Sequence, residues 1–197
     1  MRILGPNCLG LIVPGRRLNA SFAADAPRPG EIAFLSQSGA LGTSVLDWAI
    51  REKIGFSAFV SLGNSADVDF ADLIDYFGED EKTRSIILYI ESLKNARRFM
   101  TAARAFARSK PIIVYKAGRF PESSEAAASH TGALASEDAV YDAAFQRAGL
   151  ARVFDIGEIF DVAELLGRRQ IPKGDRLGIV TNGGGPGVMA VDALIDA

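Results

Sequence analysis

This sequence of 197 residues has few of the residue types that mark specialised protein classes, since it contains one cysteine, one histidine and one tryptophan. The single cysteine, Cys8, excludes a disulfide within the chain and favours a reducing compartment, so we expect a cytoplasmic protein. One cysteine and one histidine also cannot form a Cys/His zinc site, and we expect no metal centre in the chain.

Long apolar runs and an excess of one charge are absent too. No run approaches the roughly 20 apolar residues that span a bilayer, and no basic and apolar signal segment begins the sequence. The 22 lysines and arginines nearly balance the 24 aspartates and glutamates, for a net charge of −2. We therefore expect neither a membrane nor a nucleic acid as a partner. The hydrophobic content of 48% is typical of a globular protein of ordinary domain size.

Two common catalytic motifs are missing. There is no G-x-x-x-x-G-K-[ST] sequence, which excludes a P-loop protein. Ser38 lacks the flanking glycine of a G-x-S-x-G nucleophile elbow, so a hydrolase triad would have to use His130 alone.

His130, the only histidine, is the candidate reactive residue. Small residues surround it at 126–133, and this pattern predicts a loop. An imidazole is partly unprotonated near neutral pH, and one that meets a phosphoryl donor can act as a covalent nucleophile. The alternative is a histidine that only forms hydrogen bonds within its loop.

Two turns rich in small residues have the form of phosphate-binding loops. Residues 36–39 (SQSG) follow an apolar run at 32–35 and precede a helical pattern. Residues 182–187 (NGGGPG) follow a second apolar run at 177–181 and also open a helical pattern. A strand, a small polar turn and a helix direct unpaired backbone N–H groups and the helix dipole at an anion. The alternative for each is a plain turn whose glycines allow tight packing.

Strand and helix patterns alternate along the chain. This alternation predicts a parallel α/β sheet with helices on both faces, whose ligands bind at the carboxyl ends of the strands. We expect one domain over 1–169, a linker at 170–175 and the start of a second, truncated α/β domain at 176–197. The expected strands are 1–4, 11–13, 31–35, 56–62, 84–91, 111–116, 151–155 and 177–181. The expected helices are 40–53, 69–78, 95–109, 137–148, 156–168 and 188–194.

Four motifs occur in one order and spacing: residues 5–8 (GPNC), residues 36–39 (SQSG), Glu91 and residues 129–133 (SHTGA). Together they resemble the NDP-forming acyl-CoA synthetases, the superfamily of ADP-forming acetate–CoA ligase and succinyl-CoA synthetase, over essentially the whole chain. The resemblance implies a flavodoxin-like, succinyl-CoA synthetase-like sheet domain. It also implies an acid–CoA ligase that interconverts acid, CoA and ATP with acyl-CoA, ADP and phosphate through an acyl phosphate and a phosphohistidine.

The resemblance implies roles for particular residues. His130 would carry the phosphoryl group, and Glu91 would orient its ring and stabilise its charged form, although Glu91 could instead be an ordinary strand-end acid. Cys8 is a candidate for packing rather than for nucleophilic attack. The implied phosphate-binding residues are Ser36, Ser38, Gly39, Gly183, Gly184 and Gly185. The residues implied to lie near CoA or the acyl group are Asn7, Cys8, Gly63 and Asn64.

The resemblance also implies partners. CoA or acyl-CoA, ATP or ADP, and Mg²⁺ would be bound mainly by domains outside this chain, namely an N-terminal CoA-binding domain and a nucleotide-grasp domain or subunit. Phosphate and a small carboxylic acid would complete the reactants. We expect an oligomer, because domain-interface surface would otherwise be exposed.

Two other functions remain open. Some bacterial protein lysine acetyltransferases carry a similar region as a regulatory module that senses acyl-CoA or nucleotide without turnover. A flavodoxin-like domain could also bind a phosphate-bearing ligand without being phosphorylated. The presence of His130, Glu91 and both glycine-rich loops favours the ligase.

Overall fold

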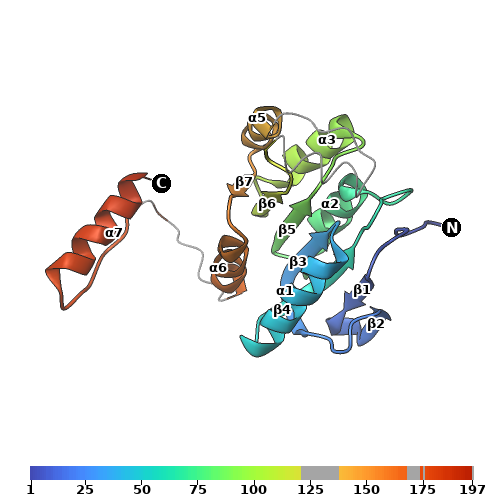
Figure 1. Ribbon diagram of the computed structural model, residues 1–197, viewed down its shortest axis with the longest axis horizontal. Helices are drawn as coiled ribbons and strands as arrows, with labels where there is room; N and C mark the ends of the chain where they lie inside the picture. Colours follow the sequence, from blue (N-terminus) through green and yellow to red (C-terminus); the bar gives the residue numbers. More distant parts are fainter. Residues whose placement is uncertain (121–137, 168–173, 175, 197) are drawn as a thin grey trace.

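The computed structural model of this protein describes residues 1–120, 138–167, 174 and 176–196. Within these residues, seven strands form one sheet in the order β2-β1-β4-β3-β5-β6-β7 (Figure 1). The strands are β1 (Gly10–Val13), β2 (Leu18–Ser21), β3 (Arg28–Ser36), β4 (Gly55–Ser61), β5 (Ser85–Ile90), β6 (Ile112–Lys116) and β7 (Ala151–Val153). Strands β3 to β7 pair in parallel, which confirms the expected parallel α/β sheet.

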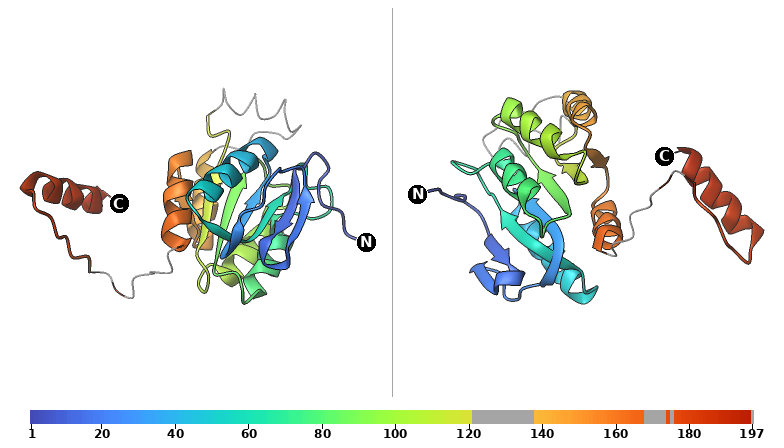
Figure 2. Two further views of the ribbon diagram at one scale, coloured as in Figure 1. Left: turned by 90° about the horizontal axis from the view of Figure 1, so that it is seen from below. Right: turned by 180° about the vertical axis from the view of Figure 1, so that it is seen from behind.

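Helices cover both faces of the sheet (Figure 2). One apolar cluster joins the sheet to α2, α3 and α5, and a second cluster joins it to α1 and α6. On β3, Ala33 and Leu35 belong to the first cluster and Phe34 to the second, so this strand is buried on both faces. The helices are η1 (Pro14–Arg16), α1 (Gly39–Arg51), α2 (Phe70–Glu79), α3 (Ala96–Phe106), α5 (Asp138–Ala148), α6 (Ile156–Gly167) and α7 (Gly184–Asp196).

The sheet edge beside β4 differs from the prediction. The expected strand at 11–13 is β1, but it turns back through η1 into β2 as an antiparallel hairpin, and β2 was not predicted. Because β2 is largely exposed, its residues lack the apolar pattern by which a buried strand is recognised. The expected strand at 1–4 is wrong: the segment does not join the sheet and is held instead to Asp67 and Val68 through the backbone of Ile3.

The segment at 177–181, expected to be the first strand of a second domain, does not form a strand within the described residues. A strand requires a hydrogen-bonded neighbour, and within the described residues this segment has none. The helix that follows, α7, forms as predicted and stands apart from the sheet in Figure 1, with Met189 and Ile195 exposed. Among the described residues, no helix is both long enough and apolar enough to cross a membrane.

Helix α2 begins with a reciprocal cap. The Asp69 carboxylate accepts from the Asp72 N–H at 3.1 Å, and the Asp72 carboxylate accepts from the Asp69 N–H at 3.0 Å. Asp72 also pairs with Arg98 at 2.8 Å and with Arg2 at 3.1 Å. Burial raises the pKa of Asp72, but the Asp69 N–H and the two arginines outweigh burial and lower that pKa to about 2.

The Asp72→Ala variant is expected to lose about 0.5–2 kcal/mol of unfolding free energy at neutral pH, because one capping interaction is removed. A carboxyl whose pKa is lowered by folding stabilises the protein above its unfolded pKa, and that contribution is lost as the pH falls through the folded value of about 2. Urea unfolding should therefore show the difference from wild type shrinking from about pH 5 to about pH 3.

The Asp75→Ala variant is the matched control on the same helix. Within the described residues the Asp75 carboxyl has no hydrogen bond, and its pKa is raised, mainly by burial. A loss of stability at Asp72 that is the same at every pH would contradict the proposed ionic contribution.

Candidate functional site

A cavity of about 940 Å³ opens at the carboxyl ends of the parallel strands, and we call it the site cavity. Its volume lies within the range of small-molecule pockets, and its place is that expected for ligands of parallel α/β sheets. The residues that line it are Asn7, Cys8, Leu9, Phe22, Gln37, Ser38, Gly39, Ala40, Gly63, Asn64, Tyr89, Glu91, Ser92, Lys94, Ala117 and Gly118.

The structure brings some of the sequence-predicted site residues together and leaves others apart. Those that line the site cavity are Asn7, Cys8, Ser38, Gly39, Gly63, Asn64 and Glu91. Ser36 is fully buried beneath the cavity instead of lining it. Gly183, Gly184 and Gly185 lie at the start of α7 and do not line the cavity. His130 lies outside the described residues.

The turn between β3 and α1 directs a helix N-terminus at the site cavity. Ser36 Oγ accepts from the Ser38 N–H at 3.0 Å and donates to the Ser38 carbonyl at 2.8 Å, which holds the turn. Ser38 then caps α1, its hydroxyl accepting from the Leu41 N–H at 3.2 Å. Gly39 and Ala40 follow the cap and line the cavity, and the first N–H groups of a helix have no partner within the helix. This end of the cavity is therefore suited to an anion.

Gln37 ties the end of β3 to the end of β5. Its side-chain oxygen accepts from the N–H of Glu91 at 2.6 Å and from that of Ser92 at 3.0 Å, and its amide nitrogen donates to the Ser92 carbonyl at 2.9 Å. The backbone of Glu91 is thereby held beside the α1 N-terminus. Gln37 was not predicted from the sequence, although it lies between Ser36 and Ser38 in the predicted phosphate-binding turn.

The opposite wall depends on a close approach between two loops. Gly63 has a φ of +52°, and a Cβ atom there would lie 2.2 Å from the Pro6 carbonyl oxygen and 2.3 Å from that of Asn7. Asn64 N–H donates to the Pro6 carbonyl at 2.9 Å, and the Asn7 amide donates to Asn64 Oδ1 at 3.4 Å. Glycine at position 63 therefore lets the segment that carries Cys8 lie against the end of β4.

Two further side chains of the site cavity were missed by the sequence analysis. Lys94 Nζ donates to the Asn64 carbonyl at 2.7 Å and brings a positive charge to the wall. Tyr89 stacks on Tyr115 with ring centroids 5.4 Å apart. Burial, followed by the charge of Glu91, raises the pKa of Tyr89 to about 12, so its hydroxyl stays protonated at neutral pH.

A buried lysine lies at the end of the neighbouring strand. Lys116 Nζ donates to the Ala117 carbonyl and lies 4.6 Å from the centroid of the Tyr141 ring. Burial lowers the pKa of Lys116. Within the part of the chain that the structure describes, no three His, Cys, Asp or Glu side chains group closely enough to hold a metal ion.

Comparisons with known proteins agree with this architecture. Residues 29–166 match the model of the succinyl-CoA ligase-like flavodoxin domain. The chain is 53% identical over 193 residues to the alpha subunit of ADP-forming acetate–CoA ligase I from Pyrococcus furiosus, covering 98% of this chain and 42% of that subunit. It is 44% identical over 196 residues to ADP-forming acetate–CoA ligase from Methanocaldococcus jannaschii, covering all of this chain and 28% of that protein.

A solved structure gives the same result. The dinucleotide-forming acetyl-coenzyme A synthetase 1 of Ca. Korarchaeum cryptofilum, in complex with phosphate and ADP, superposes with a TM-score of 0.93 and 43% identity. The match covers 100% of this chain and 43% of that one, so the chain spans less than half the length of these relatives. From its parallel sheet, its family match and these likenesses, the chain belongs to the succinyl-CoA ligase-like flavodoxin domain family of the NDP-forming acyl-CoA synthetase superfamily.

Proposed function

We propose that this chain carries the phosphohistidine part of an ADP-forming acid–CoA ligase. The whole enzyme would interconvert acid, CoA and ATP with acyl-CoA, ADP and phosphate. The observation that carries the proposal is the site cavity, where the α1 N-terminus and Glu91 lie at adjacent strand ends, joined by Gln37. Relatives named as ADP-forming acetate–CoA ligases support the reaction class.

The residues of the cavity suit the transfer of a phosphoryl group. His130 would accept the group from an acyl phosphate and pass it to ADP. Glu91 would hold the ring in one tautomer and stabilise the charge that forms on it. The N–H groups at the start of α1, with Ser38 and Gly39, would bind the phosphate oxygens.

The wall formed by Asn7, Cys8, Gly63 and Asn64 is proposed to face the acyl group and the thiol end of CoA. The Cys8 sulfur, 3.8 Å from the Leu4 carbonyl oxygen, is proposed as a packing group within that wall. CoA, the nucleotide and Mg²⁺ would be held mainly by other parts of the enzyme.

The proposed domain division is 1–169 for the flavodoxin-like domain, 170–175 for a linker and 176–197 for the start of a second α/β domain. Gly183, Gly184 and Gly185 would form a second phosphate loop at the start of α7. We further propose a nucleotide-grasp domain or subunit as partner, an oligomeric enzyme and a cytoplasmic location. The single cysteine supports the location.

The test uses the full-length parent enzyme with its nucleotide-binding partner, labelled ATP and Mg²⁺. The protein is expected to take up acid-labile, base-stable phosphate, as a phosphohistidine does, and to release it when CoA and a carboxylic acid are added. Formation of acyl-CoA in step with this release would support the ligase. Binding of acyl-CoA with no labelling would contradict it and favour a ligand-sensing module.

A further inference from the structure

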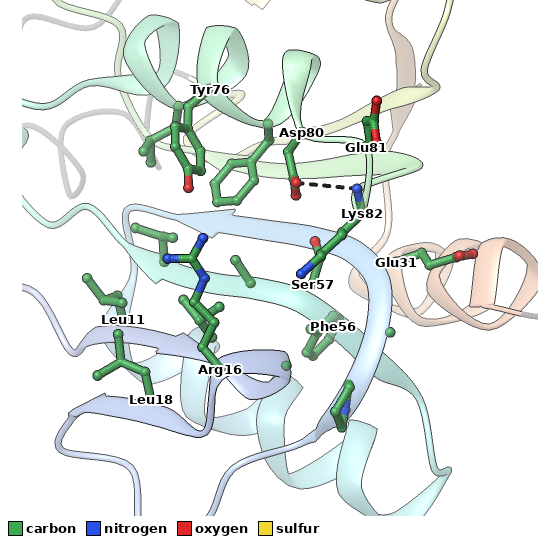
Figure 3. A pocket seen from close by; sticks show the side chains of 18 of the residues that line it. Leu11, Arg16, Leu18, Glu31, Phe56, Ser57, Tyr76, Asp80, Glu81 and Lys82 are labelled. Carbon is green, nitrogen blue, oxygen red and sulfur yellow. Dashed lines mark hydrogen bonds between the residues drawn. The ribbon is translucent and has the colours of Figure 1, made fainter.

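A second cavity, of about 720 Å³, shares no lining residue with the site cavity, and we call it the hairpin cavity. It lies between the β1–β2 hairpin with η1 on one side, β4 beneath, and α2 with the connection to β5 on the other (Figure 3). Glu31 and Phe56, near the starts of β3 and β4, help to line it, whereas the site cavity lies where these strands end. The roles proposed for the site cavity do not explain the presence of the hairpin cavity.

The wall of the hairpin cavity is largely apolar. The hairpin adds a sheet face beyond the region that α2 covers, and this face carries Leu11 and Val13. Val60 continues the surface on β4, and Leu73 and Phe77 form the side toward α2. An apolar chain placed there would bury hydrocarbon surface at about 25 cal/mol per Å².

Two cations reach into this space from opposite sides. Arg16 extends from η1 and Lys82 from the connection after α2, and in Figure 3 both charged groups point into the cavity. Neither charged group has a hydrogen bond or ion pair to another described residue. The Tyr76 hydroxyl also points inward.

Among the described residues, no ion pair joins these cations to the carboxylates that share the cavity wall. In Figure 3 the carboxylates of Glu31 and Glu81 point outward, and that of Glu31 pairs with Arg84 at 3.4 Å. The Asp80 carboxylate accepts from the Lys82 backbone N–H at 3.3 Å and from the Thr83 hydroxyl at 2.7 Å. Arg16 and Lys82 therefore present to the cavity two charged groups that have no carboxylate partner among the described residues.

We propose that the hairpin cavity binds an amphipathic monoanion, namely a carboxylate on a medium-length alkyl chain. The alkyl chain lies along Leu11, Val60 and Phe77, and the carboxylate lies between Arg16 and Lys82. The apolar wall supplies affinity by burial, and the two cations, Arg16 and Lys82, select an anion over a neutral ligand of the same shape. Because the two cavities share no residue, this binding is separate from the ligase site.

The test is calorimetric titration of the full-length parent protein with decanoate. Decanol is the control that has the same alkyl chain without the charge, and acetate is the control that has the carboxylate without a long alkyl chain. Decanoate is expected to bind saturably at one site per chain, decanol at least about tenfold more weakly and acetate not at all. Equal binding of decanoate and decanol, or no binding of decanoate, would overturn the proposal.

Variants locate the binding. Arg16→Glu with Lys82→Glu is expected to weaken decanoate binding at least about tenfold while leaving decanol unchanged. The control variant, Arg51→Glu with Arg104→Glu, reverses the charges of two exposed arginines outside the cavity. It should change neither decanoate binding nor decanol binding. Gly15 lines the cavity, and a Cβ there meets no atom within 4 Å, so a side chain can begin at this position, and Gly15→Phe is expected to block both ligands. Undiminished decanoate binding in Gly15→Phe would place the site elsewhere.

Discussion

The His130→Ala variant of the full-length enzyme is expected to take up no acid-labile phosphate. The imidazole is the only histidine side chain in these 197 residues, and alanine has no atom that could accept a phosphoryl group. Removal of a covalent nucleophile in other enzymes lowers turnover by on the order of 10⁴ to 10⁶, and we expect a loss of that size in acyl-CoA formation. The measurement is acid-labile label per chain, alongside the rate of acyl-CoA formation.

The control for this variant separates loss of chemistry from loss of fold. Thr101→Ala changes an exposed residue of α3, far along the chain from position 130, and should label like wild type. His130→Ala should unfold at the same temperature as wild type. Acid-labile label that persists in a folded His130→Ala protein would show that another residue accepts the phosphoryl group.

Glutamine in place of Glu91 is expected to slow formation of the phosphoenzyme by about 10² to 10⁴. Glutamine has nearly the same shape, and the backbone N–H of residue 91 can still donate to Gln37. The change therefore removes the negative charge that would orient and stabilise a charged imidazole while leaving the strand end in place. Rapid-quench measurement of label against time gives the rate constant.

Glu79→Gln serves as the matched control, because Glu79 is an exposed residue of α2 that does not line the site cavity. Its phosphorylation rate should equal that of wild type. A wild-type rate in Glu91→Gln would mean that Glu91 is an ordinary strand-end acid, and the proposed role would then fail even if His130 is phosphorylated.

The core of the fold was predictable because its signals are local. Buried strands such as β5 read as apolar runs, and β3 ends in a serine- and glycine-rich turn that opens a helix. Elements whose identity depends on a neighbour were not predictable in this way. The exposed strand β2 forms only because β1 pairs with it, whereas residues 177–181 have apolar character but no partner strand within the described residues.

The same distinction holds for the candidate site. The parallel alternation predicted that residues after the strands would share one edge, and Glu91 and Gly63 do line one cavity. Gln37 and Lys94 were missed because their contacts join loops that are 30 or more residues apart in the chain. The hairpin cavity was also unpredictable, because its walls come from separate segments of the chain. Its two cations, Arg16 and Lys82, belong to no recognisable sequence motif.

The Gln37 side chain has a mechanical consequence for any chemistry at the site cavity. One amide bridges the backbones of two adjacent strands that are buried on both faces, so the α1 N-terminus and Glu91 sit on a single stiff frame. The backbone at Glu91 and the turn before α1 cannot move apart without breaking these bonds. The spacing between the α1 N-terminus and the backbone that carries the Glu91 side chain is therefore set when the protein folds.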